Sequence, residues 1–242
     1  MKMQTLQFLM QDSLARVSSS NKGEVDRDLI VSRLNTVKSR PNFDWVYSHK
    51  IHYLNIPMSF DIETTSFKDG LAKKAIMYIW TLNVNGETFI GRTWKQFVDL
   101  LEIISEEFEL NKFNRRCLIY VHNLEYEFQF MRKWLDWHDI FADDKRSPLY
   151  CSTTNGIEFR CSYRLSGYSL AKLSDELTDY KTPKMVGDLD YSLLRHSETP
   201  LTDTELKYCT QDTKVVVCYV QEEIERNGDI AHIPYTKTGY VR

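Results

Sequence analysis

The sequence predicts an α/β domain built on a mixed sheet, in which an antiparallel hairpin leads into parallel strands flanked by helices. The hairpin is indicated by two β-rich segments, residues 75–84 and 87–92, which enclose the turn signal Asn85-Gly86. The parallel part is indicated by residues 116–122, a continuous apolar run typical of a strand buried on both faces. Amphipathic helical patterns follow both strand regions, and such alternation is typical of one compact layered domain.

The composition excludes several classes of protein. The 242 residues carry a formal net charge of −3, which argues against bulk non-specific affinity for nucleic acid. A cluster of metal-binding carboxylates fits the same composition, because bound ions return positive charge locally. No apolar run reaches the length of a membrane-spanning helix, and residues 1–17 lack the apolar core of a signal peptide. We therefore expect a cytoplasmic protein (host cytoplasm if the chain is viral) with no membrane partner.

The cysteine pattern is typical of a reducing compartment. The chain has five cysteines, an odd number, and none of them forms a Cys-x-x-Cys pair. Neither a disulfide scaffold nor a zinc site is expected from this spacing.

Residues 1–50 are predicted to form a helical accessory extension. Apolar residues at helical spacing predict a short amphipathic helix within residues 1–20, and residues 26–37 predict a second helix that ends before Pro41. The residues that set the first spacing are Met3, Leu6, Met10, Leu14 and Val17.

The main domain, residues 51–230, is predicted to continue the alternation of strands and helices. Further strands are expected at residues 56–64 and 157–163. Helices are expected at residues 94–108, 124–137, 169–177 and 204–226. Ser169 is a predicted N-cap, and Thr202 with Glu205 forms a predicted capping box at the start of the last helix. Asn227-Gly228 is expected to end that helix.

Two carboxylates lie on one face of the strand at residues 56–64. Side chains of a strand alternate between faces, so Asp61 and Glu63 point one way while Phe60 and Ile62 point the other. Two neighbouring carboxylates repel each other unless a positive charge lies between them. A divalent metal ion suits hard carboxylate oxygens. The alternative is a charged strand end in solvent, which is the usual meaning of an isolated Asp-x-Glu.

Two further acids occupy positions that suit the same site. Asn123 and Glu127 follow the apolar strand, at the end where open α/β sheets place ligands, and Asn123 is expected to cap the helix one turn before Glu127. In the last helix, Tyr208 and Asp212 share one face because they are four residues apart. Taken singly, a solvated Glu127 and an exposed Asp212 beside a buried tyrosine are the simpler alternatives.

Together these segments resemble a known enzyme family. The stretches DIETT, YVHNLEYEFQF, GYSLAKL, GDLDYSLL and LKYCTQD occur in that order between residues 56 and 228. They resemble the exonuclease domain of the protein-primed family B DNA polymerases of bacteriophages. This domain is a member of the DEDD superfamily of 3′–5′ exonucleases, tyrosine subtype, and the resemblance implies a ribonuclease H-like fold.

The resemblance also implies roles for individual residues. Two Mg²⁺ or Mn²⁺ ions would be held by four acids, Asp61, Glu63, Glu127 and Asp212, and the attacking water would be oriented by Tyr208. Single-stranded DNA would be bound by Thr64, His122, Asn123, Tyr126, Phe130, Ser169, Leu170 and Tyr191. Supporting roles near the active site fall to Asp188 and Lys184.

The sequence departs from the family pattern at two positions. The second-motif acid is usually aspartate but is Glu127 here, and its extra methylene still allows it to reach a metal ion. A catalytic lysine of the family is replaced by Val186, with Lys184 nearby.

The implied function is proofreading, the removal of 3′-terminal nucleotides from single-stranded DNA. The polymerase motifs of the family are absent from this chain, so residues 231–242 are interpreted as the start of a linker to a missing polymerase domain. The implied partners are the 3′ end of DNA, that polymerase portion and a terminal protein. Four tail residues are expected to lack partners within the chain: Tyr235, Lys237, Tyr240 and Arg242. Two alternatives remain open, an RNA exonuclease of the same fold and a catalytically weak module that binds single-stranded nucleic acid or protein.

Overall fold

Ten strands and seven α-helices are found in the described residues, which are 2–70, 72–142, 147–185, 190 and 193–241 of the computed structural model. The strands are β1 (Ser13–Arg16), β2 (Trp45–Ser48), β3 (Ile51–Leu54), β4 (Met58–Asp69), β5 (Ala72–Val84), β6 (Glu87–Gly91), β7 (Arg115–Val121), β8 (Trp137–Ala142), β9 (Pro148–Thr153) and β10 (Ile157–Cys161). The helices are α1 (Lys2–Leu9), α2 (Arg27–Lys38), α3 (Trp94–Glu107), α4 (Leu124–Met131), α5 (Ser162–Ser166), α6 (Leu170–Glu176), α7 (Asp203–Asn227) and the 3₁₀ helices η1 (Ile230–His232) and η2 (Lys237–Val241).

The strands form a mixed sheet in the order β1-β6-β5-β4-β7-β10-β9-β8. Strands β4, β5 and β6 pair in antiparallel fashion, whereas β4, β7 and β10 run parallel. The β2–β3 hairpin joins the sheet alongside β7. The predicted fold class, an antiparallel hairpin that leads into parallel strands, is therefore confirmed.

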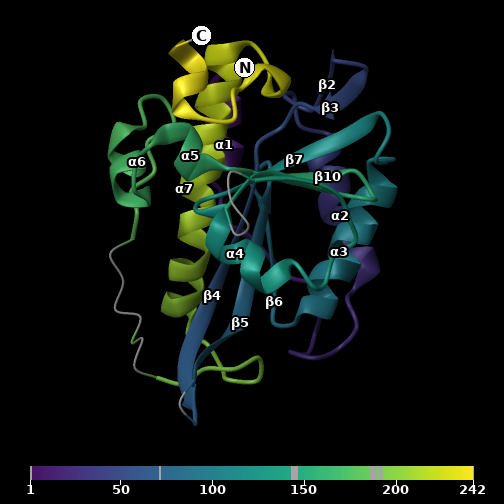
Figure 1. Ribbon diagram of the computed structural model, residues 1–242. Coiled ribbons are helices and arrows are strands. Elements are labelled where there is room, and N and C mark those ends of the chain that lie inside the picture. Colours follow the sequence, from purple (N-terminus) through teal and green to yellow (C-terminus); the bar gives the residue numbers. More distant parts are fainter. Residues whose placement is uncertain (1, 71, 143–146, 186–189, 191–192, 242) are drawn as a thin grey trace.

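Helices cover both faces of the sheet (Figure 1). Helices α2 and α3 pack together on one face, and the long helix α7 crosses β4 and β5 on the other. On the α3 side, the ring of Phe60 stacks on that of Phe97 at a centroid distance of 4.4 Å, and Ile62 joins the same core. The strand period then directs Asp61 and Glu63 toward the α7 side. This arrangement places the two carboxylates opposite a helix that carries another acid.

Local signals in the sequence account for several boundaries. Asn85 and Gly86 both have positive φ, 52° and 97°, as the tight hairpin turn requires. A Cβ at Gly86 would lie 2.5 Å from the backbone oxygen of Phe8, so glycine is needed there for space as well as conformation. At α7, the predicted capping box between Thr202 and Glu205 is present.

Two predicted helices are too long. Within residues 1–20, α1 ends at Leu9, and Ser13–Arg16 instead forms β1, which gains backbone partners by pairing in parallel with the open edge of β6. The helix expected over residues 124–137 ends at Met131, because the following residues from Trp137 onward pair with β9. Helical spacing of apolar residues did not reveal either of these long-range pairings.

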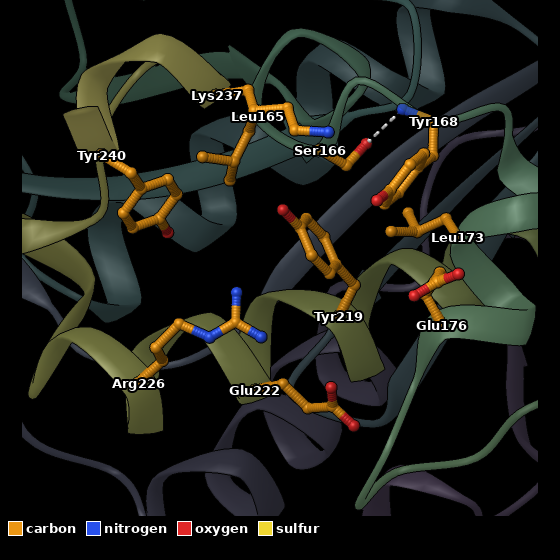
Figure 2. A pocket seen from close by; sticks show the side chains of 10 residues that line it. All are labelled: Leu165, Ser166, Tyr168, Leu173, Glu176, Tyr219, Glu222, Arg226, Lys237 and Tyr240. Atoms are coloured by element: carbon orange, nitrogen blue, oxygen red, sulfur yellow. Dashed lines mark hydrogen bonds between the residues drawn. The ribbon is translucent and has the colours of Figure 1, made fainter.

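The expectation that the tail lacks partners is wrong for its described residues. The guanidinium of Arg160 lies 4.4 Å from the ring centroid of Tyr235. Lys237 and Tyr240 line a cavity of about 230 Å³ together with residues of α5, α6 and α7. Figure 2 shows the side chains of Lys237 and Tyr240 among the ten that line this cavity. Residues 230–241 thus pack on the body of the protein, and Arg242 lies outside the described residues.

The five cysteines are all free and buried. None of the described helices is long and apolar enough to span a membrane.

A buried ion pair ties the N-terminal region to β6. The carboxylate of Glu87 is almost fully buried and accepts hydrogen bonds from Ser13, Arg33 and Arg40. We expect Arg40→Ala to destabilise the fold by about 3–5 kcal/mol, because it leaves a buried carboxylate with too little positive charge. Chemical denaturation measures this loss.

The matched control is Arg27→Ala, which removes an exposed arginine from its ion pair with Glu106. Exposed pairs contribute about 0–1 kcal/mol. Equal effects of the two substitutions would contradict a structural role for the buried pair.

Candidate active site

Four acids from three elements lie close together where α7 packs on the sheet. Asp61 and Glu63 come from β4, Glu127 from the first turns of α4, and Asp212 from α7. Burial raises the pKa of Asp61 well above its usual range, and the negative charges of Glu127, Glu63 and Asp212 raise it further. The structure therefore brings the other three predicted acids within electrostatic reach of Asp61.

The other three acids also hold their protons more tightly than usual. Burial, followed by the charge of Asp212, raises the pKa of Glu63 to about 7. Burial is the main cause that raises the pKa of Glu127 to about 8. Burial also raises the pKa of Asp212, although the nearby Lys184 ammonium opposes this shift. Such a cluster is unstable in its charged form without a compensating cation.

Two features of the sheet direct these side chains. A register shift in the β4–β5 ladder lies between Glu63 and Thr64, and bulges of this kind re-aim side chains beside functional sites. Strand β7 ends directly before α4, so Glu127 arrives from the carboxyl end of a parallel strand. The expected side-chain cap at Asn123 is wrong: this residue has φ 77° and makes no capping hydrogen bond. Asparagine tolerates this left-handed conformation, and its side chain stays exposed.

Two carboxylate oxygens of the cluster lack a hydrogen-bond partner. They are Oε2 of Glu127 and Oδ1 of Asp212, and both are buried. An unsatisfied buried polar atom costs about 1–3 kcal/mol, and more when it is charged. Asp212 forms an ion pair with Lys184, whose Nζ lies 3.5 Å from Oδ2. This lysine contacts Oδ2 and leaves both unpartnered oxygens without a hydrogen bond.

The donor set suits hard divalent ions, which prefer carboxylate oxygens. Among the described residues, however, no three acids, histidines or cysteines are already arranged around a common point as metal ligands. Like charges push the carboxylates apart when no cation lies between them. The residues present therefore fit a metal ion in chemistry, and binding would require their side chains to move closer together.

A cavity of about 150 Å³ opens onto the cluster. Its polar lining includes Asp61, Asp212, Lys184 and His122, and its apolar wall includes Leu170 of α6. The cavity thus brings together residues from β4, the end of β7, α6 and α7.

His122 faces this cavity as a neutral ring. Burial lowers its pKa to about 4, and the positive charge of Lys184 contributes to the shift. Nδ1 of His122 lies 3.1 Å from Oγ of Ser162, which begins α5. At neutral pH the ring can therefore offer a hydrogen bond to a ligand but no positive charge.

The other predicted nucleic-acid ligands fall into two groups. Tyr126 is 41% exposed, and its hydroxyl lies 2.6 Å from Oγ1 of Thr64. Its ring contacts that of Phe130 at a centroid distance of 5.1 Å. On the other side of the cavity, Ser169 caps α6 by accepting a hydrogen bond from the backbone of Lys172, as predicted.

The remaining predicted site residues are less informative. Tyr208 lies one turn before Asp212 on α7 and packs, half-buried, against the small cluster that includes Cys209. Three positions lie outside the described residues. They are Asp188, Tyr191 and Val186, the last of which stands where the resembling family has a lysine.

Sequence reasoning missed two residues that contact or influence the site. Ser162 follows β10, the parallel neighbour of β7, so adjacent strand ends bring it to His122. Knowing that these two strands are neighbours would have been enough to predict it. Arg195 is buried, and its positive charge lowers the pKa of Glu63. No local motif marks this arginine, because it reaches the site from a loop.

Comparison with solved structures identifies the fold class as that of ribonuclease H-like exonuclease domains, as the sequence resemblance implied. The chain is similar to phi29 DNA polymerase complexed with primer-template DNA and incoming nucleotide, with a TM-score of 0.56 and 14% identity over 71% of this chain and 31% of that chain. The same polymerase complexed with single-stranded DNA gives a TM-score of 0.54 and 15% identity over 70% of this chain and 32% of that chain. This chain thus spans about a third of the phi29 polymerase length.

Two further structures match over more of their own length. RNase D of Trypanosoma brucei, complexed with RNA U12, gives a TM-score of 0.52 and 7% identity over 91% of this chain and 65% of that chain. For the EXO domain of Aedes aegypti Nibbler the TM-score is 0.51 and the identity is 10%, over 96% of this chain and 94% of that chain. At these identities the likeness establishes the fold. No protein-family model matches the sequence. No curated protein matches it either.

Proposed function

We propose that this protein is a metal-dependent 3′–5′ exonuclease acting on single-stranded nucleic acid. The observation that carries the proposal is the cluster of four acids from β4, α4 and α7, one buried and three partly buried, with two buried carboxylate oxygens that have no partner. Asp61, Glu63, Glu127 and Asp212 would hold two Mg²⁺ or Mn²⁺ ions, which supply an activated water and stabilise the leaving oxygen. Tyr208 would orient that water from one turn before Asp212.

The chain's own side chains would hold the 3′-terminal nucleotides beside the acids. The exposed ring of Tyr126 and the adjacent Phe130 offer stacking surfaces for unpaired bases, which is a sequence-tolerant form of binding. The neutral His122 and the exposed amide of Asn123 offer hydrogen bonds to sugar or phosphate. Lys184 lines the cavity and offers positive charge to the phosphate. It would take the role of the lysine that the resembling family has at the position of Val186.

DNA is the proposed substrate, and proofreading in a phage-type DNA polymerase is the proposed context. Both rest on the five motif stretches, which resemble the protein-primed polymerases. The polymerase portion and a terminal protein are the proposed partners in that context. RNA is the competing substrate, and the likeness to Trypanosoma brucei RNase D, a structure complexed with RNA U12, over 91% of this chain is the observation that favours it.

A labelled-strand assay tests the proposal. A 5′-labelled single strand should be shortened one nucleotide at a time in Mg²⁺ or Mn²⁺, and chelation should stop the reaction. Asp212→Asn should reduce the rate by at least about 100-fold, since even residues that only support metal ligands cost about 10–100-fold when replaced. Parallel DNA and RNA strands distinguish the two substrates, because only RNA carries the 2′-hydroxyl.

The control is Asp203→Asn, at the exposed start of the same helix. It should retain nearly full activity. Shortening that proceeds equally well in chelator, or that survives Asp212→Asn, would rule out the proposed mechanism.

A further inference from the structure

A second surface continues directly from the proposed nucleotide site. It is a groove of about 540 Å³ between β5, α3 and the end of α4. We call it the aromatic groove, and the lining residues that define it are Met77, Trp94, Phe130, Arg132, Lys133 and Trp134.

The groove begins where the nucleotide site ends. Thr64, whose hydroxyl meets Tyr126, pairs directly with Met77 across the β4–β5 ladder. Phe130 belongs to both surfaces, because its ring contacts Tyr126 and also lines the groove. A strand held at its 3′ end by Tyr126 can therefore continue along α4 into the groove.

The groove is rich in aromatic surface that folding leaves accessible. Trp134 is 43% exposed, and its ring lies nearly parallel to that of Trp94, with an interplanar angle of 16° and a centroid distance of 6.4 Å. Ile76 on the adjacent β5 is also 37% exposed. Single exposed apolar residues are common, but contiguous ones that line a groove mark binding surfaces.

Positive charge accompanies these rings. Arg132 and Lys133 are exposed, and neither forms an ion pair with another described residue. Nζ of Lys133 lies 5.2 Å from the ring centroid of Trp134. Cations beside aromatic faces match the phosphates and bases of a single strand, whereas a purely apolar partner would leave both charges without a counter-ion.

We propose that the aromatic groove binds the nucleotides on the 5′ side of the scissile end. The ligand is single-stranded nucleic acid several nucleotides long, bound without sequence preference by stacking on Trp134 and by contacts of Arg132 and Lys133 with phosphates. This proposal rests on the proposed function of the carboxylate site and adds to it a preference for long single strands over dinucleotides.

The test compares affinities for a twelve-nucleotide strand and a dinucleotide, measured by fluorescence anisotropy in chelator so that no cleavage occurs. Trp134→Ala should weaken binding of the long strand by about 5–100-fold, the range expected for the loss of one stacked base. The ratio of long-strand to dinucleotide affinity should fall accordingly. Lys133→Ala should lower the slope of log affinity against log salt by about 0.7, the value for one phosphate contact on a single strand.

The chain offers a matched control. Lys112 and Phe113 form the same kind of cation–aromatic pair, with the ammonium 5.1 Å from the ring centroid and Phe113 75% exposed. This pair precedes β7, at the opposite end of that strand from His122. Phe113→Ala and Lys112→Ala should leave both the affinity ratio and the salt slope unchanged.

The outcomes separate the two proposals. If Trp134→Ala and Lys133→Ala bind the long strand as the wild-type protein does, the groove proposal is overturned, whether or not the enzyme cleaves. If the variants lose long-strand affinity while the wild-type protein shows no metal-dependent cleavage, the groove is supported and the exonuclease function fails. Because both side chains are exposed, circular dichroism should show unchanged folding in each variant.

Discussion

Asp61→Asn is expected to abolish metal-dependent cleavage and, at the same time, to stabilise the metal-free protein. These opposite effects have one cause. Asp61 is the acid whose pKa is raised by all three of its acidic neighbours, after burial itself. An acid in such surroundings destabilises the fold when no cation is bound, so its presence indicates a ligand-binding role. Asparagine keeps the shape of the side chain but removes its charge.

The expected magnitudes are large enough to measure. Loss of a metal ligand should reduce the cleavage rate by at least about 100-fold, more than replacement of a residue that merely supports a ligand. Relief of charge repulsion should raise the melting temperature of the metal-free protein above pH 7 by a few degrees, since about 1 kcal/mol shifts it by ~2–4 °C for a chain of this size. Cleavage assays and thermal melts in chelator measure the two effects separately.

Asp69→Asn is the matched control for this substitution. Asp69 ends the same strand, is exposed and pairs with Lys74, so its replacement should cost about 0–1 kcal/mol and leave cleavage intact. An Asp61→Asn protein that melts at a lower temperature than the wild type would indicate an ordinary structural aspartate and would contradict a metal-binding role for Asp61.

The parts of the site that are governed by local geometry were predictable from the sequence. Alternation along β4 sends Asp61 and Glu63 to one face, and the helical repeat places Tyr208 and Asp212 on one side of α7. The capping box at Thr202 fixes where that helix begins. Each of these relations spans only a few residues, so the sequence pattern contains it completely.

Relations between distant segments were not predictable in the same way. The pairing of β8 with β9 and of β1 with β6 depends on partners that only the folded sheet supplies. The bulge beside Glu63 and the approach of Arg195 are likewise consequences of register and loop path. The aromatic groove joins β5 to residues beyond α4 and has no signature in either segment alone.

The metal-free protein is expected to lose stability as pH rises. Glu127, 4% exposed, has a pKa near 8 in the folded protein, against an ordinary value near 4.5. The folded state therefore binds protons more tightly than the unfolded chain, and the free energy of unfolding falls as pH rises from about 4.5 through 8. Glu63, with a pKa near 7, contributes in the same direction.

Thermal melts in chelator between pH 5 and pH 8.5 measure this dependence. Glu127→Gln should flatten it, because the substitution removes one of the tightly held protons without changing the size of the side chain. The exposed Glu125, two residues earlier on the same helix, supplies the control substitution Glu125→Gln, which should leave the dependence as it is. A wild-type melting temperature that rises steadily over this range would contradict the raised pKa values.

The central claim is that the four acids form a divalent-metal site. Calorimetric titration of Mn²⁺ into the chelator-free protein tests it most directly. The titration is made near pH 7 in two buffers of different ionisation enthalpy. Binding should be saturable. Because metal ions bind deprotonated carboxylates, it should also release on the order of one proton or more per protein from Asp61, Glu63 and Glu127, whose pKa values are raised. Asp61→Asn should weaken binding by at least about 10-fold. No saturable binding at millimolar Mn²⁺, or binding that is unchanged by Asp61→Asn, would contradict the claim.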